Sequence, residues 1–245
     1  MTSLSKRHFT LLPLALWAQW ALPAHAQVKV IGSNGEGLEG EITSTGPKRR
    51  VQPAASNPAP MPAAILVLGD SLSAEYGIAR GTGWVSLLAT KLQTEVPGMQ
   101  VINASVSGDT TAGGRSRLPA LLQQWRPAVV VIELGGNDAL RGLGLENTRA
   151  NLEAMIEACR TVNARVVLVG MQIPPNYGAD YASRFAGLYQ ELAKRHQTGL
   201  VPFLLKGIAD APDSAKWFQP DRIHPREQAH PRMLSNVWPE IKRQL

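Results

Sequence analysis

The sequence predicts an α/β protein, a three-layer α/β/α sandwich whose helices cover both faces of a central, mainly parallel, five-stranded sheet. Three observations support this prediction. Short continuous apolar runs alternate with stretches in which apolar residues recur at helical spacing. The joints are short, as expected of parallel strands connected by right-handed crossovers. Polar clusters directly follow several apolar runs, at the edge where α/β proteins bind their ligands.

The predicted strands are short apolar runs, typical of strands buried on both faces. They lie at 65–68, 101–102, 129–132, 165–169 and 200–203. Helical spacing is seen at Trp84, Leu87, Leu88 and Leu92, at Leu118, Leu121, Leu122 and Trp125, at Leu152, Met155, Ile156 and Cys159, at Phe185, Leu188, Tyr189 and Leu192, and over 233–241. Together these elements predict one domain over residues 64–245.

The first 26 residues have the pattern of a secretory signal peptide. Lys6, Arg7 and His8 precede an apolar run over 9–22, and Ala24-His25-Ala26 forms a small-x-small cleavage pattern. An uncleaved membrane anchor is the alternative, but the run is shorter than the roughly 20 residues that span a bilayer. We therefore expect an exported protein, periplasmic or secreted. Residues 27–63 are rich in glycine and proline without apolar periodicity, which predicts a flexible tail.

The composition, with 44% hydrophobic and 18% charged residues, excludes disorder, collagen and coiled coil as descriptions of the whole chain. The single cysteine, Cys159, excludes an intrachain disulfide and a cysteine-based metal cluster. Without Lys6 and Arg7, 23 basic residues oppose 19 acidic ones, a net charge of +4. This charge gives no reason to expect a nucleic-acid partner, although it is compatible with transient contact with a membrane or lipid surface.

Two polar clusters follow the first two strands. Ser71, in the cluster 69–73, projects from a strand end and is a candidate nucleophile. Gly69 allows the tight backbone path that such a turn needs. Capping of the next helix by Asp70 or Ser71 is the alternative. In the cluster 103–110, the amide of Gly108 could face an oxyanion, with Asp109 and Thr110 as helix caps. Taken alone, a turn with caps explains this second cluster equally well.

Two further clusters complete a catalytic set. Asn137, after the strand at 129–132, carries an amide that donates without acting as a base, as an oxyanion donor must. Asp138 is expected to fix its loop through backbone amides. Near the C-terminus, Asp221 lies three residues before His224 and could accept its Nδ1 proton, leaving Nε2 as the base. A solvent-exposed histidine is the alternative. A metal site at His224, His230 and Asp221 is weakly indicated, and we expect none.

These residues resemble the ordered motifs of the SGNH hydrolases, also called the GDSL family: Gly69-Asp70-Ser71-Leu72, then Gly108, then Gly136-Asn137-Asp138, and finally Asp221 with His224-Pro225. The resemblance covers about residues 64–245. It implies a flavodoxin-like fold and no cofactor. It also implies Ser71 as nucleophile, His224 as general base and Asp221 as its orienting partner. The oxyanion hole would be the backbone amides of Ser71 and Gly108 with the side chain of Asn137.

The resemblance is strongest to bacterial periplasmic members with acyl-CoA thioesterase, lysophospholipase and arylesterase activities. It implies a serine esterase that forms an acyl-serine intermediate and acts on small-molecule esters and thioesters. One departure is Arg222, where that subgroup commonly carries a small residue, which would alter charge at the pocket rim. A monomer is expected. The predicted walls of an acyl pocket, each also explicable as ordinary packing, are Leu140, Leu143, Ile173, Pro174, Trp217 and Phe218.

Two alternative functions stay open at this point. A carbohydrate O-acetylesterase acting on cell-wall or polysaccharide acetyl groups would use the same catalytic groups. A non-catalytic carbohydrate- or lipid-binding protein on the same fold is less favoured, because the Ser71, His224 and Asp221 set is complete.

Overall fold

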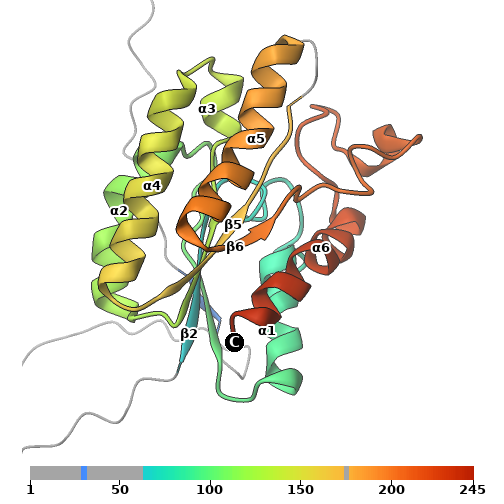
Figure 1. The fold of residues 1–245 in the computed structure, drawn as a ribbon. Helices are drawn as coiled ribbons and strands as arrows, with labels where there is room; N and C mark the ends of the chain where they lie inside the picture. The colour runs from blue at the N-terminus through green and yellow to red at the C-terminus, as the bar shows by residue number, and fades with distance from the viewer. Residues whose placement is uncertain (1–28, 32–62, 174–176) are drawn as a thin grey trace, which may run out of the picture.

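A computed structural model of the chain describes residues 29–31, 63–173 and 177–245. Figure 1 shows its central sheet flanked by helices. The strands of this sheet have the order β1-β3-β2-β4-β5-β6. The strands are β1 (Lys29–Ile31), β2 (Ala64–Gly69), β3 (Gln100–Asn103), β4 (Val129–Glu133), β5 (Arg165–Val169) and β6 (Gly199–Val201). From β3 to β6 all neighbouring pairs are parallel. The five predicted strands are therefore present as one parallel sheet.

The sixth strand corrects the prediction that all of 27–63 is a tail. β1 pairs antiparallel with β3, with Val30 opposite Ile102. A run of three residues is too short for an alternating pattern, and the pairing depends on backbone groups of a strand about 70 residues away, so the local sequence gives no signal. The predicted signal peptide at 1–26 and the rest of that tail lie outside the described residues and stay predictions.

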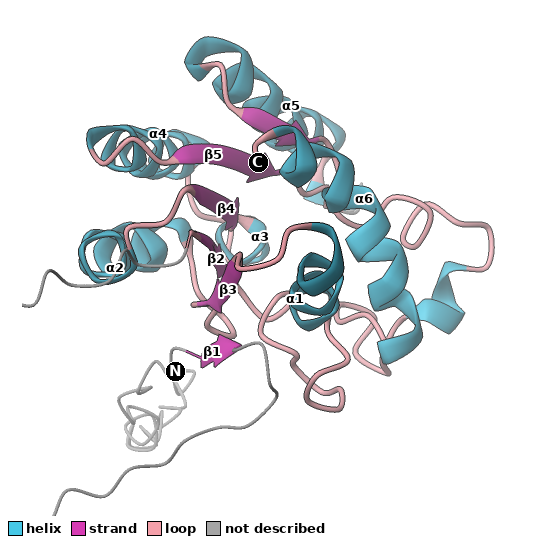
Figure 2. Ribbon diagram, turned by 90° about the horizontal axis from the view of Figure 1, so that it is seen from below, coloured by secondary structure: helices cyan, strands magenta, loops and turns pink. Residues whose placement is uncertain are grey.

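Helices cover both faces of the sheet, as predicted. Those of 12 residues or more are α1 (Trp84–Glu95), α2 (Thr111–Trp125), α4 (Leu145–Thr161), α5 (Ala179–His196) and α6 (His230–Arg243). Figure 2 shows α2 and α4 on one face of the strands and α1 and α6 on the other. α5 packs beside α4, and α1 packs beside α6. The last helix begins three residues before the predicted 233, and the predicted strand at 200–203 ends at Val201.

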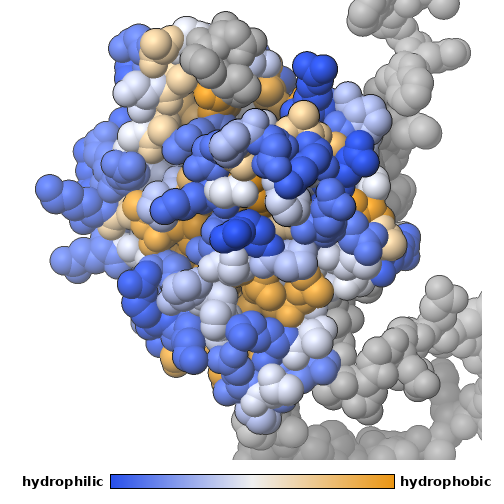
Figure 3. All heavy atoms as spheres, turned by 90° about the vertical axis from the view of Figure 1, so that its right-hand side faces the viewer, coloured by the Kyte–Doolittle hydropathy of each residue, from blue (hydrophilic) through white to orange (hydrophobic). Residues whose placement is uncertain are grey.

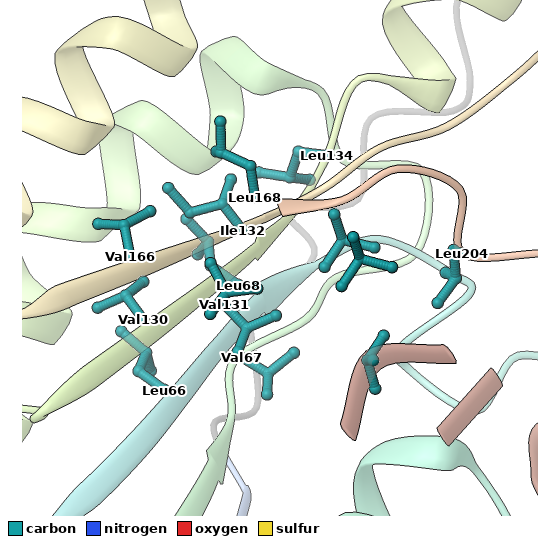
Figure 4. Close-up of a cluster of buried hydrophobic side chains, with 14 of the residues drawn as sticks. Leu66, Val67, Leu68, Val130, Val131, Ile132, Leu134, Val166, Leu168 and Leu204 are labelled. Atoms are coloured by element: carbon teal, nitrogen blue, oxygen red, sulfur yellow. The ribbon is translucent and has the colours of Figure 1, made fainter. Parts of the chain in front are cut away.

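The core lies between the sheet and these two helical layers. Side chains of the central strands β2, β4 and β5 point to both faces and, apart from Arg165 at the start of β5, are buried, as predicted for strands covered twice (Figure 4). Trp84, Phe185 and Tyr189 are among the largest fully buried side chains. Of the predicted helix-spaced apolar residues between 84 and 192, all are buried except Leu87 and Trp125, which are half-buried. The periodicity therefore identified the inward faces of the helices correctly.

One buried histidine fixes the start of α6 against the start of α1. His230 is 3% exposed, and its Nδ1 accepts a hydrogen bond of 3.0 Å from the backbone N–H of Trp84. Burial lowers the pKa of His230 to about 4, against a smaller opposite effect of Glu75, so the ring is neutral near pH 7 and can accept this bond. Because α6 directly follows the loop that carries His224, the contact also anchors one end of that loop.

Three short helices were not predicted: α3 (Gly136–Leu140), η2 (Ser214–Trp217) and η3 (Glu227–Ala229). Each is at most five residues long, so helical periodicity could not reveal it. Among the helices that the structure describes, none is long and apolar enough to cross a membrane.

Candidate active site

The four predicted polar clusters meet at one edge of the sheet. Ser71 follows β2, Gly108 follows β3 and Asn137 opens α3 after β4. These three strands are adjacent and parallel, so their carboxyl ends point the same way. His224 reaches the same place from the long connection between β6 and α6, which lies to the right of the sheet in Figure 1.

A serine, a histidine and a carboxylate are joined by hydrogen bonds at this edge. Nε2 of His224 lies 2.8 Å from Oγ of Ser71, and Nδ1 of His224 lies 2.6 Å from Oδ2 of Asp221. Residues 153 positions apart in the chain are therefore in direct contact. The side chains of His224 and Asp221 are 17% and 38% exposed, so the group is open to small molecules from solvent.

Asp221 is anchored through one carboxylate oxygen, which leaves the other oxygen to bond the histidine. Its Oδ1 accepts the backbone N–H groups of Ile223 and His224, both at 3.0 Å. Burial raises its pKa, but hydrogen bonds from the His224 ring and from these two amides outweigh burial and lower the pKa of Asp221 to about 2. The carboxylate is thus ionised at neutral pH. It holds the proton on Nδ1 and leaves Nε2 to accept from the Ser71 hydroxyl.

Gln219 holds the serine loop and the histidine loop together. Its Nε2 donates to the carbonyl of Tyr76 at 2.9 Å and to that of Pro225 at 3.1 Å. Its backbone N–H donates to the carbonyl of His224 at 2.8 Å. One side chain therefore joins the segment that carries the hydroxyl to the segment that carries the imidazole. Sequence analysis did not single out Gln219, because its partner in the serine loop is 143 residues away.

Two backbone amides at the site are available to an incoming ligand. Within the described part of the chain, neither the N–H of Ser71 nor that of Gly108 has a hydrogen-bond acceptor. Gly108 has a φ of +77°, a conformation that favours glycine. Nη2 of Arg141 donates to the carbonyl of Gly108 at 2.8 Å and so fixes the peptide unit between Gly108 and the next residue. Amides placed like this can stabilise a negatively charged oxygen.

The amide of Asn137 is present at the site but already bonded. Its Nδ2 donates to Oδ2 of Asp70 at 3.0 Å and to the carbonyl of Asp109 at 2.9 Å. The residue that the sequence predicted as a free oxyanion donor therefore has both amide hydrogens engaged in this structure. For Asn137 to donate to a third acceptor, one of these two bonds must be exchanged.

Two buried carboxyl groups support the turn that presents Ser71. Oε2 of Glu133 accepts from the Ser73 hydroxyl at 2.7 Å and from the Asp70 N–H at 3.3 Å. A Cβ atom at position 69 would lie only 2.7–2.9 Å from side-chain atoms of Ser73 and Glu133, so only glycine fits there. Burial raises the pKa of Asp70 to about 6. Burial, followed by the Asp70 charge, raises the pKa of Glu133 well above its ordinary value. With its pKa at about 6, Asp70 is mostly ionised at pH 7, whereas burial favours the neutral form of Glu133.

Thr110 has the capping role expected of it, and Asp138 fixes its loop through one backbone amide and two hydroxyl groups, where backbone amides alone were expected. Asp138 is 2% exposed and accepts the backbone N–H of Thr111 at 2.9 Å and the hydroxyl groups of Thr111 and Thr148. It therefore ties α3 to the first turns of α2 and α4. Thr110 caps α2, its side chain accepting from the N–H of Gly113. Asp109 instead pairs with Arg117 at 2.6 Å.

The predicted pocket walls are only partly consistent with the structure. Leu140 and Leu143 are 38% and 40% exposed, so they are available to an acyl chain. Ile173 is buried in the core, and Trp217 and Phe218 are half-buried against it, as the packing alternative proposed. Pro174 lies outside the described residues. Arg222 is exposed, with a φ of +58° that favours glycine or asparagine. Its predicted effect on the pocket rim stays a prediction.

Among the described residues, no group of three or more histidine, cysteine, aspartate or glutamate side chains is arranged to hold a metal ion. Asp221 and His224 contact each other and Ser71, whereas His230 is turned toward Trp84. The chemistry that this arrangement can support is thus nucleophilic attack by an alcohol activated by an imidazole.

Comparison with known proteins agrees with the motif order. The sequence model of the GDSL-like Lipase/Acylhydrolase family matches residues 67–232, which include the serine, glycine, asparagine, aspartate and histidine described above. The chain belongs to this family. As a member of it, the chain has the SGNH hydrolase fold and is a hydrolase that acts on ester bonds. The family and the fold class predicted from the sequence are confirmed.

Similar members of the GDSL family are bacterial enzymes. Esterase TesA of Pseudomonas aeruginosa is 48% identical over 178 residues, which cover 73% of this chain and 87% of that protein. Thioesterase 1/protease 1/lysophospholipase L1 of Escherichia coli K12 is 41% identical over 167 residues, covering 68% and 77%. A crystal structure of TesA matches with a TM-score of 0.71 at 47% identity, covering 74% of this chain and 99% of that one.

Proposed function

We propose that this esterase cleaves acyl-CoA thioesters, lysophospholipids and aryl esters through an acyl-serine intermediate on Ser71. The observation that carries the proposal is the contact of 2.8 Å between the Ser71 hydroxyl and Nε2 of His224, with Asp221 behind the imidazole. The relatives named as an esterase and as a thioesterase and lysophospholipase support the substrate range.

In the first step, Oγ of Ser71 attacks the carbonyl carbon while Nε2 of His224 takes its proton. The tetrahedral intermediate collapses when His224 returns that proton to the leaving alkoxide or thiolate, which frees an alcohol or thiol and leaves the acyl group on Ser71. A water molecule then gives a proton to His224 and attacks the acyl carbon. His224 returns this proton to Oγ of Ser71 as the acyl–oxygen bond breaks, which releases a carboxylic acid and restores the free serine. The ionised Asp221 stabilises the imidazolium in both halves of the reaction.

The oxyanion is stabilised by the free N–H groups of Ser71 and Gly108 and by Asn137. The Asn137 bond to Asp70 is charge-assisted, whereas its bond to the carbonyl of Asp109 is between neutral groups and is the weaker one. The hydrogen facing Asp109 is therefore the one exchanged when the oxyanion forms. Asp70 keeps its bond and holds the amide in place.

Replacing Asn137 with alanine is expected to lower kcat by about 10²–10³-fold with little change in KM, because a donor that acts mainly in the transition state is lost. The measurement is steady-state hydrolysis of p-nitrophenyl butyrate. Asn147→Ala, at an exposed asparagine of α4, is the matched control and should retain wild-type kcat. A kcat within threefold of wild type for Asn137→Ala, in a folded enzyme, would remove this residue from the oxyanion hole.

The substrate range is tested with a panel on the purified protein and on its Ser71→Ala variant. The panel holds p-nitrophenyl esters from acetyl to dodecanoyl, palmitoyl-CoA, lysophosphatidylcholine and acetylated xylan. The exposed side chains of Leu140 and Leu143 lead us to expect higher kcat/KM for medium and long acyl chains than for acetyl esters. A preference for acetylated xylan, with loss of activity beyond acetyl, would favour the carbohydrate O-acetylesterase instead.

Export and lipid contact also belong to this proposal. A signal peptide over 1–26 would deliver the enzyme to the periplasm or the medium, where lysophospholipids of the cell envelope are accessible. Contact with a lipid surface would be transient, because the hydrophobic patches on the face seen in Figure 3 are small and interrupted by hydrophilic side chains. The enzyme would act as a monomer.

A further inference from the structure

An aromatic side chain that has no place in the mechanism above lies directly against the catalytic imidazole. The ring centroids of Tyr76 and His224 are 4.3 Å apart, and the ring planes are tilted by 40°. Tyr76 is 50% exposed, so burial in the core does not explain its position. Among the described residues, its hydroxyl has no hydrogen-bond partner, so the contact with His224 is made by the ring and not by the polar end.

The backbone holds Tyr76 in this position from both sides. Its N–H donates to the carbonyl of Ser71 at 3.4 Å, and its carbonyl accepts from Nε2 of Gln219 at 2.9 Å. Since Gln219 also bonds the carbonyl of His224, the tyrosine and the histidine are fixed to one common residue. The ring contact is therefore part of the junction between the two catalytic loops.

Resting on the function proposed above, we propose that Tyr76 is a positioning residue that acts through His224, holding the imidazole toward Ser71 and stabilising the imidazolium that forms during acyl transfer. The face of an aromatic ring carries partial negative charge and attracts a cation placed within about 6 Å of its centre. The imidazolium forms at such a place each time Ser71 or water gives up its proton.

Other groups that face His224 act in the same direction. Asp221 bonds Nδ1 directly, and the charge of Asp70, on the serine turn, interacts with the ring through space. Both carboxylates favour the charged ring, and neither depends on Tyr76 for its own hydrogen bonds. The contribution of the tyrosine can therefore be separated from theirs by changing Tyr76 alone.

The test compares Tyr76→Leu, Tyr76→Phe and Tyr76→Trp, with Tyr177→Leu as a matched control at another tyrosine that is 41% exposed. Leucine keeps apolar contact but lacks a π face. We expect Tyr76→Leu to lower the plateau of kcat/KM by about 2–5-fold and to move its acid limb to lower pH by about 0.3–0.7 unit. The limb moves down because the neutral ring, which is the active base, persists to lower pH once the imidazolium is less stable. Phenylalanine, tryptophan and Tyr177→Leu should leave both quantities within error of wild type.

A second measurement does not depend on activity. NMR titration of the imidazole C–H signals of His224 in the resting enzyme should show the same downward shift in Tyr76→Leu and none in Tyr76→Phe. Unchanged midpoints in Tyr76→Leu, or equal losses in the leucine and phenylalanine variants, would overturn the proposal and leave Tyr76 with a packing role. Ester hydrolysis that persists in Ser71→Ala would instead overturn the proposed function, whatever the titration gives.

Discussion

Replacing Ser71 with alanine is expected to lower kcat for ester hydrolysis by about 10⁵–10⁶-fold, because acyl transfer then has no nucleophile on the protein. The remaining rate should still exceed the uncatalysed one, since the amides of Ser71 and Gly108 persist. The Ser71 side chain contacts His224 at the mouth of the site and supports no core packing, so the variant should fold with an unchanged melting temperature. The rate is measured as release of p-nitrophenol from p-nitrophenyl butyrate, followed continuously or sampled at fixed times.

Ser73 provides the matched control for this prediction. It lies on the same turn, but its hydroxyl points to the buried carboxyl of Glu133 and not to His224. Ser73→Ala should react with a fluorophosphonate probe as wild type does, although some stability will be lost with the bond to Glu133. Ser71→Ala should not react at all. Labelling of Ser71→Ala, or near-full hydrolysis in a preparation free of host esterases, would contradict the assignment of Ser71 as nucleophile.

The convergence of the site could be predicted because it follows from topology. Parallel strands joined by short crossovers end at one edge, so the sequence alone predicts that the residues after 68, 102 and 132 lie close together. The Asp221 and His224 pair was predicted for a different reason, since a separation of three residues in a turn brings two side chains into contact. Both inferences use local spacing and the general geometry of the fold.

The features that sequence analysis missed depend on partners far along the chain. β1 is recognisable only by its pairing with β3, and Gln219 only by its bond to the carbonyl of Tyr76. The Tyr76 ring reaches His224 across about 150 residues, and nothing in the local sequence marks it. The two bonds of Asn137 were missed for the same reason, because they require the loops after β2 and β3 to be placed against α3.

These long-range bonds connect the catalytic residues into one network. Glu133 holds Ser73 and the Asp70 amide, and Asp70 in turn holds Asn137. On the other side of Ser71, Gln219 holds Tyr76 and the His224 loop. The nucleophile therefore lies between a buried, rigid support and a more exposed one. Substitutions on the buried side should lower stability, and those of Asp70 or Asn137 should lower the rate as well, whereas substitutions on the exposed side should change the rate alone.

Replacing Asp221 with asparagine is expected to lower kcat by about 10³–10⁴-fold at pH 7, although the substitution changes no atom positions. The reason lies in the anchoring of this side chain. Its Oδ1 accepts two backbone N–H groups, and only an oxygen can take that place. The amide nitrogen of asparagine must then face Nδ1 of His224 and donate to it. This selects the tautomer with the proton on Nε2, which cannot accept the proton of Ser71.

The tautomer itself provides the decisive measurement for Asp221→Asn. The ¹⁵N chemical shifts of His224 should report a protonated Nδ1 in the wild type and a protonated Nε2 in Asp221→Asn. Asp213→Asn, at an exposed aspartate that pairs with Lys216 and does not contact His224, should keep the wild-type tautomer and rate. Asp221→Ala removes the carboxylate acceptor without introducing the amide donor of asparagine. It should therefore allow both tautomers of His224 and retain more activity than Asp221→Asn. An asparagine variant within tenfold of wild type would mean that the carboxylate does not set the proton on His224.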